Sequence, residues 1–199
     1  MFLHIKPTTM EPCSLDWTEF ESTANSWFCR GCNWVYPNKL GIDVNTSIDC
    51  LRNRYLTFLN GTGLVLSHQG LLSLLPEDLV EQGFALGKVR SRDGRSLDTW
   101  RSMNAIDRII VRGTKNVSFR VCEACGRNVY FAQGTPYVFR SQIGGKSIFG
   151  TDSYGILIDS KYVDSKLIAM LKGVDVESID CRNDSLDGLN QLPWSTSTD

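Results

Sequence analysis

The chain has 199 residues, 42% of them hydrophobic, and a formal net charge of −1 at pH 7. This length fits one large domain or two small ones, and the hydrophobic content is sufficient for a packed core. The balanced charge excludes a molecule that binds polyanions over its whole surface. The sequence has no run of about 18 apolar residues, so it predicts no membrane-spanning helix.

The first part of the chain predicts an entry segment followed by one amphipathic helix. Residues 1–28 are mildly acidic and aromatic, and we expect a strand or irregular segment there. A helix is expected over 46–59, because Ile48, Leu51 and Tyr55 recur at helical spacing after a capping Thr or Ser. Its apolar side would face the core.

The middle of the chain predicts short elements around a polar stretch. A strand is expected over 64–67, and Pro76 begins a short helix, because proline fits the first turn and acidic residues follow it. Residues 89–98 are polar and basic, with a turn signal inside them. Apolar, β-branched runs predict strands over 109–111 and 117–121.

The last third predicts strands and one helix. Strands are expected over 128–132, 137–139 and 155–158. A helix should begin at Ser160 and run to Lys172, where a glycine ends it, and a final strand follows. The chain would therefore close with a strand–helix–strand unit.

Two C-x-x-C motifs, here called the first knuckle (Cys29, Cys32) and the second knuckle (Cys122, Cys125), are the most informative feature. Each is followed by a polar or glycine turn residue and an aromatic, strand-like run. Two such turns can supply the four thiolates that a tetrahedral zinc ion prefers. Usual pairs of this kind are separated by about 15–20 residues, so this ribbon would contain an insertion.

The predicted fold is therefore α+β, a split zinc ribbon with an inserted, helix-containing subdomain. We expect one domain over residues 1–181, with the insertion at about 40–115 and a polar tail over 182–199. Four cysteines would close the coordination sphere, which indicates a structural Zn²⁺ rather than a catalytic one. A redox dithiol and buried thiols without metal are the alternatives.

The remaining motifs point away from an enzyme. The glycines near Lys146 lack the first glycine of a P-loop, and His4 and His68 have no sequence neighbours that suggest an acid–base site. We therefore expect no catalytic residue and no small-molecule substrate. Cys13, Cys50 and Cys181 would be free thiols. With no secretory signal recognised, the expected compartment is the cytoplasm.

The charges are unevenly distributed, and this suggests protein-binding faces. Residues 86–127 carry ten Lys and Arg against four Asp and Glu, whereas residues 152–199 carry four against nine. Partner-binding candidates are two tryptophans and the acids near the end of the chain: Trp100, Asp175, Glu177, Asp180, Asp184, Asp187 and Trp194. The basic stretch supports a nucleic-acid-binding zinc ribbon as the alternative function: Lys88, Arg90, Arg92, Arg95, Arg101, Arg108, Arg112 and Lys115. We regard nucleic acid as the less favoured partner.

The paired knuckles, with the second reading Cys122-Glu123-Ala124-Cys125-Gly126-Arg127, resemble the double-CxxCG family of bacterial immunity proteins, which accompany polymorphic and swarming-inhibition toxins. The segment around Pro76 and the closing strand–helix–strand are similar too. Asn33 stands where the family has glycine after the first knuckle. The resemblance implies an antidote that binds a cognate toxin and occludes its active site.

Overall fold

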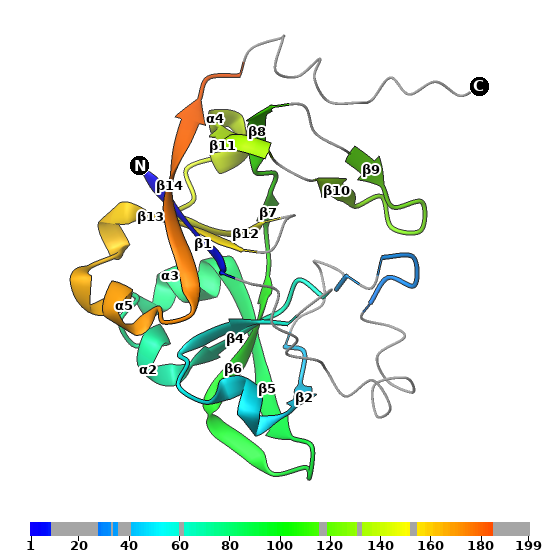
Figure 1. Ribbon diagram of the computed structural model, residues 1–199, viewed down its shortest axis with the longest axis vertical. Coiled ribbons are helices and arrows are strands. Elements are labelled where there is room, and N and C mark those ends of the chain that lie inside the picture. The colour runs from blue at the N-terminus through cyan, green and yellow to red at the C-terminus, as the bar shows by residue number, and fades with distance from the viewer. Residues whose placement is uncertain are drawn as a thin grey trace.

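The computed structural model describes residues 1–8, 28–32, 34–35, 41–59, 62–115, 119–130, 133–151 and 155–184. Strands dominate and the helices are short, so the predicted α+β class is confirmed. Figure 1 shows two sheets, one above the other in this view, with the helices α2 (Gln69–Leu72), α3 (Glu77–Gly83) and α5 (Ser165–Met170) grouped along the left side. No helix in the described ranges is long and apolar enough to cross a membrane.

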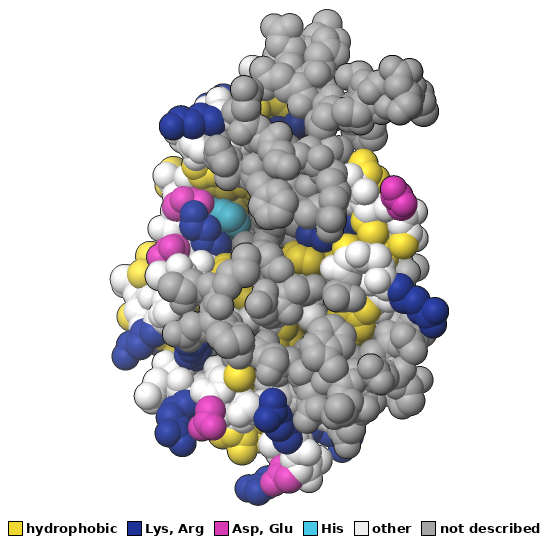
Figure 2. Space-filling view, turned by 45° about the vertical axis from the view of Figure 1, so that its right-hand side comes forward, with side chains coloured by type: hydrophobic (Ala, Val, Ile, Leu, Met, Phe, Trp, Pro, Cys, Tyr) yellow, Lys and Arg dark blue, Asp and Glu magenta, His cyan; other side chains and the backbone are white. Residues whose placement is uncertain are grey.

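The smaller sheet has five strands, in the order β2-β5-β6-β4-β3. All five come from the predicted insertion between the knuckles. Their bounds are β2 Val44–Thr46, β3 Leu56–Phe58, β4 Val65–His68, β5 Phe84–Ser91 and β6 Ser96–Ala105. The long β5–β6 hairpin extends to the lower end of the molecule in Figure 1, where Figure 2 shows Lys and Arg side chains with carboxylates between them.

The larger sheet has seven strands, in the order β7-β12-β13-β1-β14-β11-β8. The N-terminal strand β1 pairs antiparallel with both β13 and β14, so it lies between the two strands of the closing strand–helix–strand unit. The bounds are β1 Phe2–Pro7, β7 Arg108–Ile109, β8 Arg112–Lys115, β11 Gln133–Phe139, β12 Ile148–Thr151, β13 Ile156–Asp159 and β14 Val174–Arg182. The expected insertion at 40–115 therefore contributes to both sheets.

A separate two-stranded hairpin, β9 (Phe119–Val121) and β10 (Asn128–Tyr130), carries the second knuckle. Strands β8 and β11, which lead into and out of this hairpin along the chain, pair with one another in the larger sheet. The second knuckle thus sits at the tip of an arm that begins in the larger sheet (Figure 1).

One hydrophobic core joins the two sheets. It includes Phe84 and Met103 from the smaller sheet and Ile148 and Ile158 from the larger one, and Leu79 of a helix packs among them. The helices are α2 Gln69–Leu72, α3 Glu77–Gly83, α4 Arg140–Ile143 and α5 Ser165–Met170, with 3₁₀ turns η2 Ile48–Leu51 and η3 Ser160–Tyr162. Two further cores cover the outer faces, one on each sheet.

The helix predicted over 46–59 is wrong. Ser47 does cap a turn, but only η2 forms, and Asn53 then takes a left-handed conformation with φ 59°. The next residues become strand β3, whose three side chains are all buried and which pairs with β4. The helical spacing was therefore coincidental, and pairing in the sheet decides the structure of this segment.

The helix predicted from Ser160 to Lys172 is divided in two. η3 ends at Tyr162, and Asp164 then caps α5 by accepting a hydrogen bond from the Leu167 N–H at 2.7 Å. In α5, Ile168 is 49% exposed, whereas Leu167 beside it is buried. Most of residues 89–98 belong to β5 and β6, and the predicted turn lies between these strands, where Gly94 N–H donates to the Ser91 carbonyl at 2.8 Å. The predicted helix at Pro76 and the predicted strand over 64–67 are confirmed, and each begins one residue later than expected. The final strand is confirmed and continues to Arg182.

Candidate metal centre

The two knuckles have the same local architecture. Cys29 N–H donates to the Trp34 carbonyl at 2.9 Å, and Cys122 N–H donates to the Arg127 carbonyl at 2.9 Å. In the first knuckle, Phe28 before the motif pairs with Val35 after it. In the second, Val121 pairs with Asn128 in the same way, between β9 and β10. Each C-x-x-C is therefore the turn between two short, antiparallel strand segments.

The structure brings all four knuckle cysteines into one cluster, although 89 residues separate the motifs in sequence. Their sulfur atoms all lie within 4.8 Å of one another. Cys29 Sγ lies 3.6 Å from Cys122 Sγ, and Cys32 Sγ lies 3.8 Å from Cys125 Sγ. A tetrahedral ion with metal–sulfur bonds of about 2.3 Å requires sulfur separations of about 3.8 Å. The four thiols therefore fit a metal ion with little adjustment, as the sequence predicted.

The first knuckle is fixed to the smaller sheet. Val35 N–H donates to the Thr62 carbonyl at 2.8 Å, and Thr62 lies in the turn between β3 and β4. Phe28 and Val35 are buried in the core on the outer face of that sheet. Since the second knuckle belongs to the arm of the larger sheet, a metal held by both knuckles would join the two sheets.

The protonation behaviour of the cluster also fits a cation. Burial raises the pKa of Cys29, but the N–H groups of Gly31 and Cys32 donate to its sulfur and, with the neighbouring thiols, lower its pKa to about 6. Burial raises the pKa of Cys32, and burial together with the neighbouring sulfurs raises the pKa of Cys125 to about 12. The cluster therefore favours a thiolate at Cys29 and opposes one at Cys32 or Cys125, since like charges repel at this distance. A divalent cation would remove that repulsion.

Only a small residue fits between the knuckles at position 31. A Cβ added to Gly31 would lie 3.0 Å from Cys122 Sγ and 3.1 Å from the Ala124 Cβ. Gly31 and Ala124 are the third residues of their motifs, so the two turns approach each other through their smallest side chains. This requirement is not visible in the spacing of the cysteines.

Trp34 couples the knuckles to each other and to the smaller sheet. The ring is 4% exposed, and the guanidinium of Arg127, from the second knuckle, lies 3.4 Å from its centroid. The Arg108 guanidinium is 5.3 Å from the same ring. A Cβ added to Gly63 would lie 2.2 Å from the indole, so this glycine lets the β3–β4 turn reach the ring. The packing roles of Arg127 and Gly63 were not predicted from the sequence.

The thiols outside the cluster are separate from it. Cys50 and Cys181 are half-buried thiols that lie outside the cluster, as expected. Cys13 lies outside the described residues. A redox C-x-x-C motif is expected at the start of a helix. In the described residues of the two knuckles, each motif instead forms a turn between strand segments. The redox alternative therefore has no support from the local geometry.

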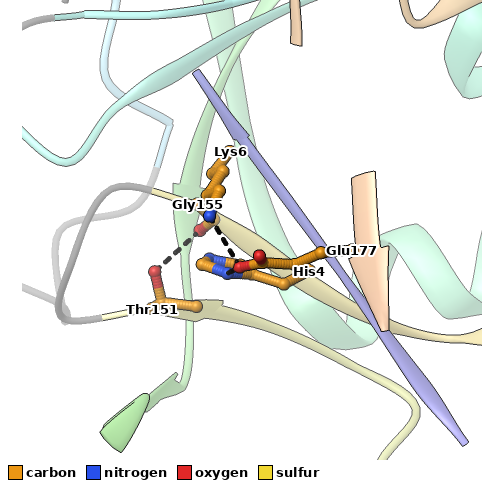
Figure 3. A network of polar contacts seen from close by, with 5 residues as sticks. All are labelled: His4, Lys6, Thr151, Gly155 and Glu177. Carbon is orange, nitrogen blue, oxygen red and sulfur yellow. Dashed lines mark hydrogen bonds and ion pairs between the residues drawn. The ribbon is translucent and has the colours of Figure 1, made fainter. Parts of the chain in front are cut away.

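A second polar cluster lies on the larger sheet, between β1 and β14. The Glu177 carboxylate accepts from Lys6 Nζ at 2.8 Å and lies 3.2 Å from His4 Nδ1 (Figure 3). His4 is 4% exposed, and a Cβ on Gly155 would come within 2.3 Å of its Nε2. Burial lowers the pKa of His4, although Glu177 partly opposes this. Burial raises the pKa of Glu177, but hydrogen bonds from Lys6 and His4 hold it below its usual value.

The acids proposed for partner binding do not form one patch. Asp175 and Glu177 share a face of β14, whereas exposed Asp180 points to the other face, because side chains alternate along a strand. Glu177 is engaged by Lys6, and Asp184 accepts a hydrogen bond from Ser141 N–H at 3.2 Å. Asp187 and Trp194 lie outside the described residues.

Trp100, which was predicted from the sequence as a partner-binding candidate, is buried in the structure. Its side chain is 7% exposed and belongs to the core on the outer face of the smaller sheet. The ring packs edge-on against His68, at a centroid distance of 5.5 Å. Polar sequence neighbours misled the prediction, because alternate residues of a strand face opposite sides.

The basic residues of the middle segment do not form one stripe either. Arg112 is buried with its guanidinium 4.7 Å from the Phe139 ring, and Arg108 packs toward Trp34. Arg95 is paired with Asp93 at 2.8 Å. The eight basic residues therefore do not form one continuous cationic surface that could bind a nucleic-acid backbone.

Comparison of the chain with protein-family models and with curated proteins gave no match. The function must therefore be argued from the four-cysteine centre and the surfaces around it.

Proposed function

We propose that Cys29, Cys32, Cys122 and Cys125 bind one Zn²⁺ ion as a structural site, completing a split zinc ribbon. The observation that carries this proposal is the convergence of four thiols at separations suited to tetrahedral coordination. Soft thiolate ligands select zinc or iron–sulfur chemistry over calcium or magnesium. Four protein ligands leave no open position for a substrate, so the ion would act on folding and rigidity.

Metal analysis tests this assignment directly. Protein purified without added metal should contain about one equivalent of zinc, and the four thiols should react with a thiol reagent only after a chelator is added. Cys50 and Cys181, which are half-buried and outside the cluster, provide the internal comparison. Zinc below half an equivalent, with all four cluster thiols titrating freely, would refute the assignment.

We further propose that the protein is a cytoplasmic, non-enzymatic immunity protein that binds a cognate bacterial toxin and occludes its active site. The support is the pair of C-x-x-C knuckles, the feature that resembles the double-CxxCG immunity family. A reducing compartment would keep the cysteines as thiols, so that the four in the cluster can bind metal. The ribbon and the two packed sheets would present a rigid surface, which lowers the ordering cost of binding.

A neutralisation experiment tests the immunity proposal. A candidate toxin, sought among the genes adjacent to the one for this protein, would be expressed in a sensitive bacterial host, with and without the protein. Co-expression should restore growth, and the purified pair should form a complex burying about 1,200–2,000 Å², as stable complexes do. A complex that leaves toxin activity unchanged, or a host that is not protected by well-expressed, folded protein, would contradict the proposal.

A further inference from the structure

One face of the β5–β6 hairpin is exposed to solvent where the hairpin extends beyond the core that joins the sheets. Phe84 is buried in that core, and Leu86, Lys88 and Arg90 follow on the same face because they are alternate residues of β5. All three are exposed, and Leu86 keeps 39% of its surface accessible. The face is therefore covered at Phe84 and open from Leu86 onward, toward the hairpin tip in Figure 1.

This face forms a groove with an unusual arrangement of charge. The groove has a volume of ≈ 470 Å³ and includes Lys88, Arg90 and Arg101 in its lining. Lys88 lies directly opposite Arg101 in the β5–β6 pairing. Like charges in directly opposed positions destabilise a sheet. In the described part of the chain, no carboxylate forms an ion pair with Lys88, Arg90 or Arg101. The three cations are therefore available to a ligand.

Two carboxylates in the same groove restrict what that ligand can be. Asp43 accepts a hydrogen bond from the Lys88 backbone N–H at 2.8 Å, and Asp98 accepts one from the Ser96 hydroxyl. Both acids line the groove beside the cations. A continuous polyphosphate backbone would meet repulsion at each of them. Isolated carboxylates spaced along a polypeptide can instead contact the cations and avoid the acids.

The spacing of the cations matches an extended peptide. Lys88 and Arg90 are alternate residues of one strand, and such positions repeat at about 6.6–6.8 Å. Alternate side chains of an extended ligand have the same repeat. An apolar side chain of that ligand would cover Leu86, which is exposed at the inner end of the groove.

We propose that Leu86, Lys88, Arg90 and Arg101 form a docking groove for an extended, acidic segment of a partner protein. The identification of that partner as a toxin rests on the proposed function, whereas the chemistry of the groove does not. This face differs from the acidic β14 residues that the sequence favoured. Charge complementarity of this kind mainly accelerates association and selects the partner.

A peptide-binding titration tests the proposed groove. The probe is a short, fluorescently labelled peptide of alternating Glu and Val, and the whole chain is titrated against it at low ionic strength. The test variant is Lys88→Gln with Arg90→Gln, which leaves the Arg101 hydrogen bonds to the Asp98 and Trp100 carbonyls intact. The matched control, Lys166→Gln with Lys172→Gln, removes the same charge from exposed positions in and after α5. We expect about fivefold weaker peptide binding for the test variant and less than about twofold for the control, given the usual range for exposed pairs.

The outcomes separate the possible ligands. Equal losses for both variants would overturn the inference, because binding would then depend on overall charge. Tighter binding of labelled oligothymidylate than of the peptide would also overturn it and indicate a nucleic-acid groove. Thermal unfolding of both variants would be measured alongside, and because the like-charge pair is relieved, the test variant should melt no lower than the control.

The cognate toxin then distinguishes the inference from the proposed function. If the toxin is bound and neutralised equally by the wild type and by Lys88→Gln/Arg90→Gln, the immunity role stands and the groove inference fails. If the acidic peptide binds with the expected difference but no toxin is neutralised, the groove stands and the immunity role fails.

Discussion

Replacing Gly63 by alanine should destabilise this protein more than replacement of any freely exposed, left-handed glycine. Gly63 has φ +74°, a conformation that costs an L-residue about 1–2 kcal/mol. The added Cβ would also lie 2.2 Å from the Trp34 indole. That ring is 4% exposed and packed by Arg127, so it has little room to move. Overpacking of a core typically costs about 1–3 kcal/mol, which gives a total of about 2–5 kcal/mol.

Gly94 provides the matched control. It has φ +80° in the β5–β6 turn, and an added Cβ there meets no atom within 4 Å. Gly94→Ala should therefore lose only the backbone contribution of about 1–2 kcal/mol. Urea unfolding of the two variants, at constant m value, measures the difference, which isolates the contact with Trp34. If the two variants differ by less than about 0.5 kcal/mol, the ring does not occupy the position described here.

The same substitution should weaken the metal centre. The Trp34 carbonyl accepts the Cys29 N–H bond that closes the first knuckle. Displacing the indole would disturb this turn, and changes just outside a metal's ligands commonly lower its affinity about 10–100-fold. Competition for zinc with a chromophoric chelator would show the effect in Gly63→Ala and leave Gly94→Ala at the wild-type affinity.

Three further predictions concern the cluster and the buried histidine. Cys29→Ser should remove nearly all bound zinc and lower the melting temperature, while Cys181→Ser keeps both near wild type; a fully stable, metal-free Cys29→Ser protein would contradict a structural role. Gly31→Ala should keep the fold but lower zinc affinity roughly tenfold, because the new methyl group presses on a ligand sulfur; chelator competition would measure it. His4 has a lowered pKa in the folded state, so its contribution to stability is present above about pH 6.5 and is lost as pH falls toward that lowered pKa. Melting temperatures across this range should show a decline that His4→Gln removes and Glu177→Gln retains.

The position of the centre explains why a metal would matter to the whole molecule. One knuckle is bonded to the β3–β4 turn of the smaller sheet, and the other ends the arm of the larger sheet. A metal ion across them would close a long loop of chain, which restricts the unfolded state in the way a disulfide does. It would also fix the arm beside Trp34.

The four candidate metal ligands, the turn at each C-x-x-C motif and the mixed class of the fold could all be predicted from the amino-acid sequence. These follow from local chemistry, since a C-x-x-C turn followed by strand-forming residues carries its own geometry. The helix at Pro76 was predictable for the same reason, because proline and the acids Glu77 and Asp78 specify a helix start within one turn. Such signals do not depend on distant parts of the chain.

Strand pairing and side-chain burial, in contrast, depend on contacts between distant segments and could not be predicted. The stretch 46–59 has helical spacing, yet strand pairing with β4 buries Leu56, Thr57 and Phe58 together. Trp100 has polar neighbours in sequence, yet its face of β6 lies against a core. Gly63 approaches Trp34 although 28 residues separate them. Contacts between residues far apart in sequence supply the burial free energy that local preferences cannot, and they leave no periodic signal in the sequence.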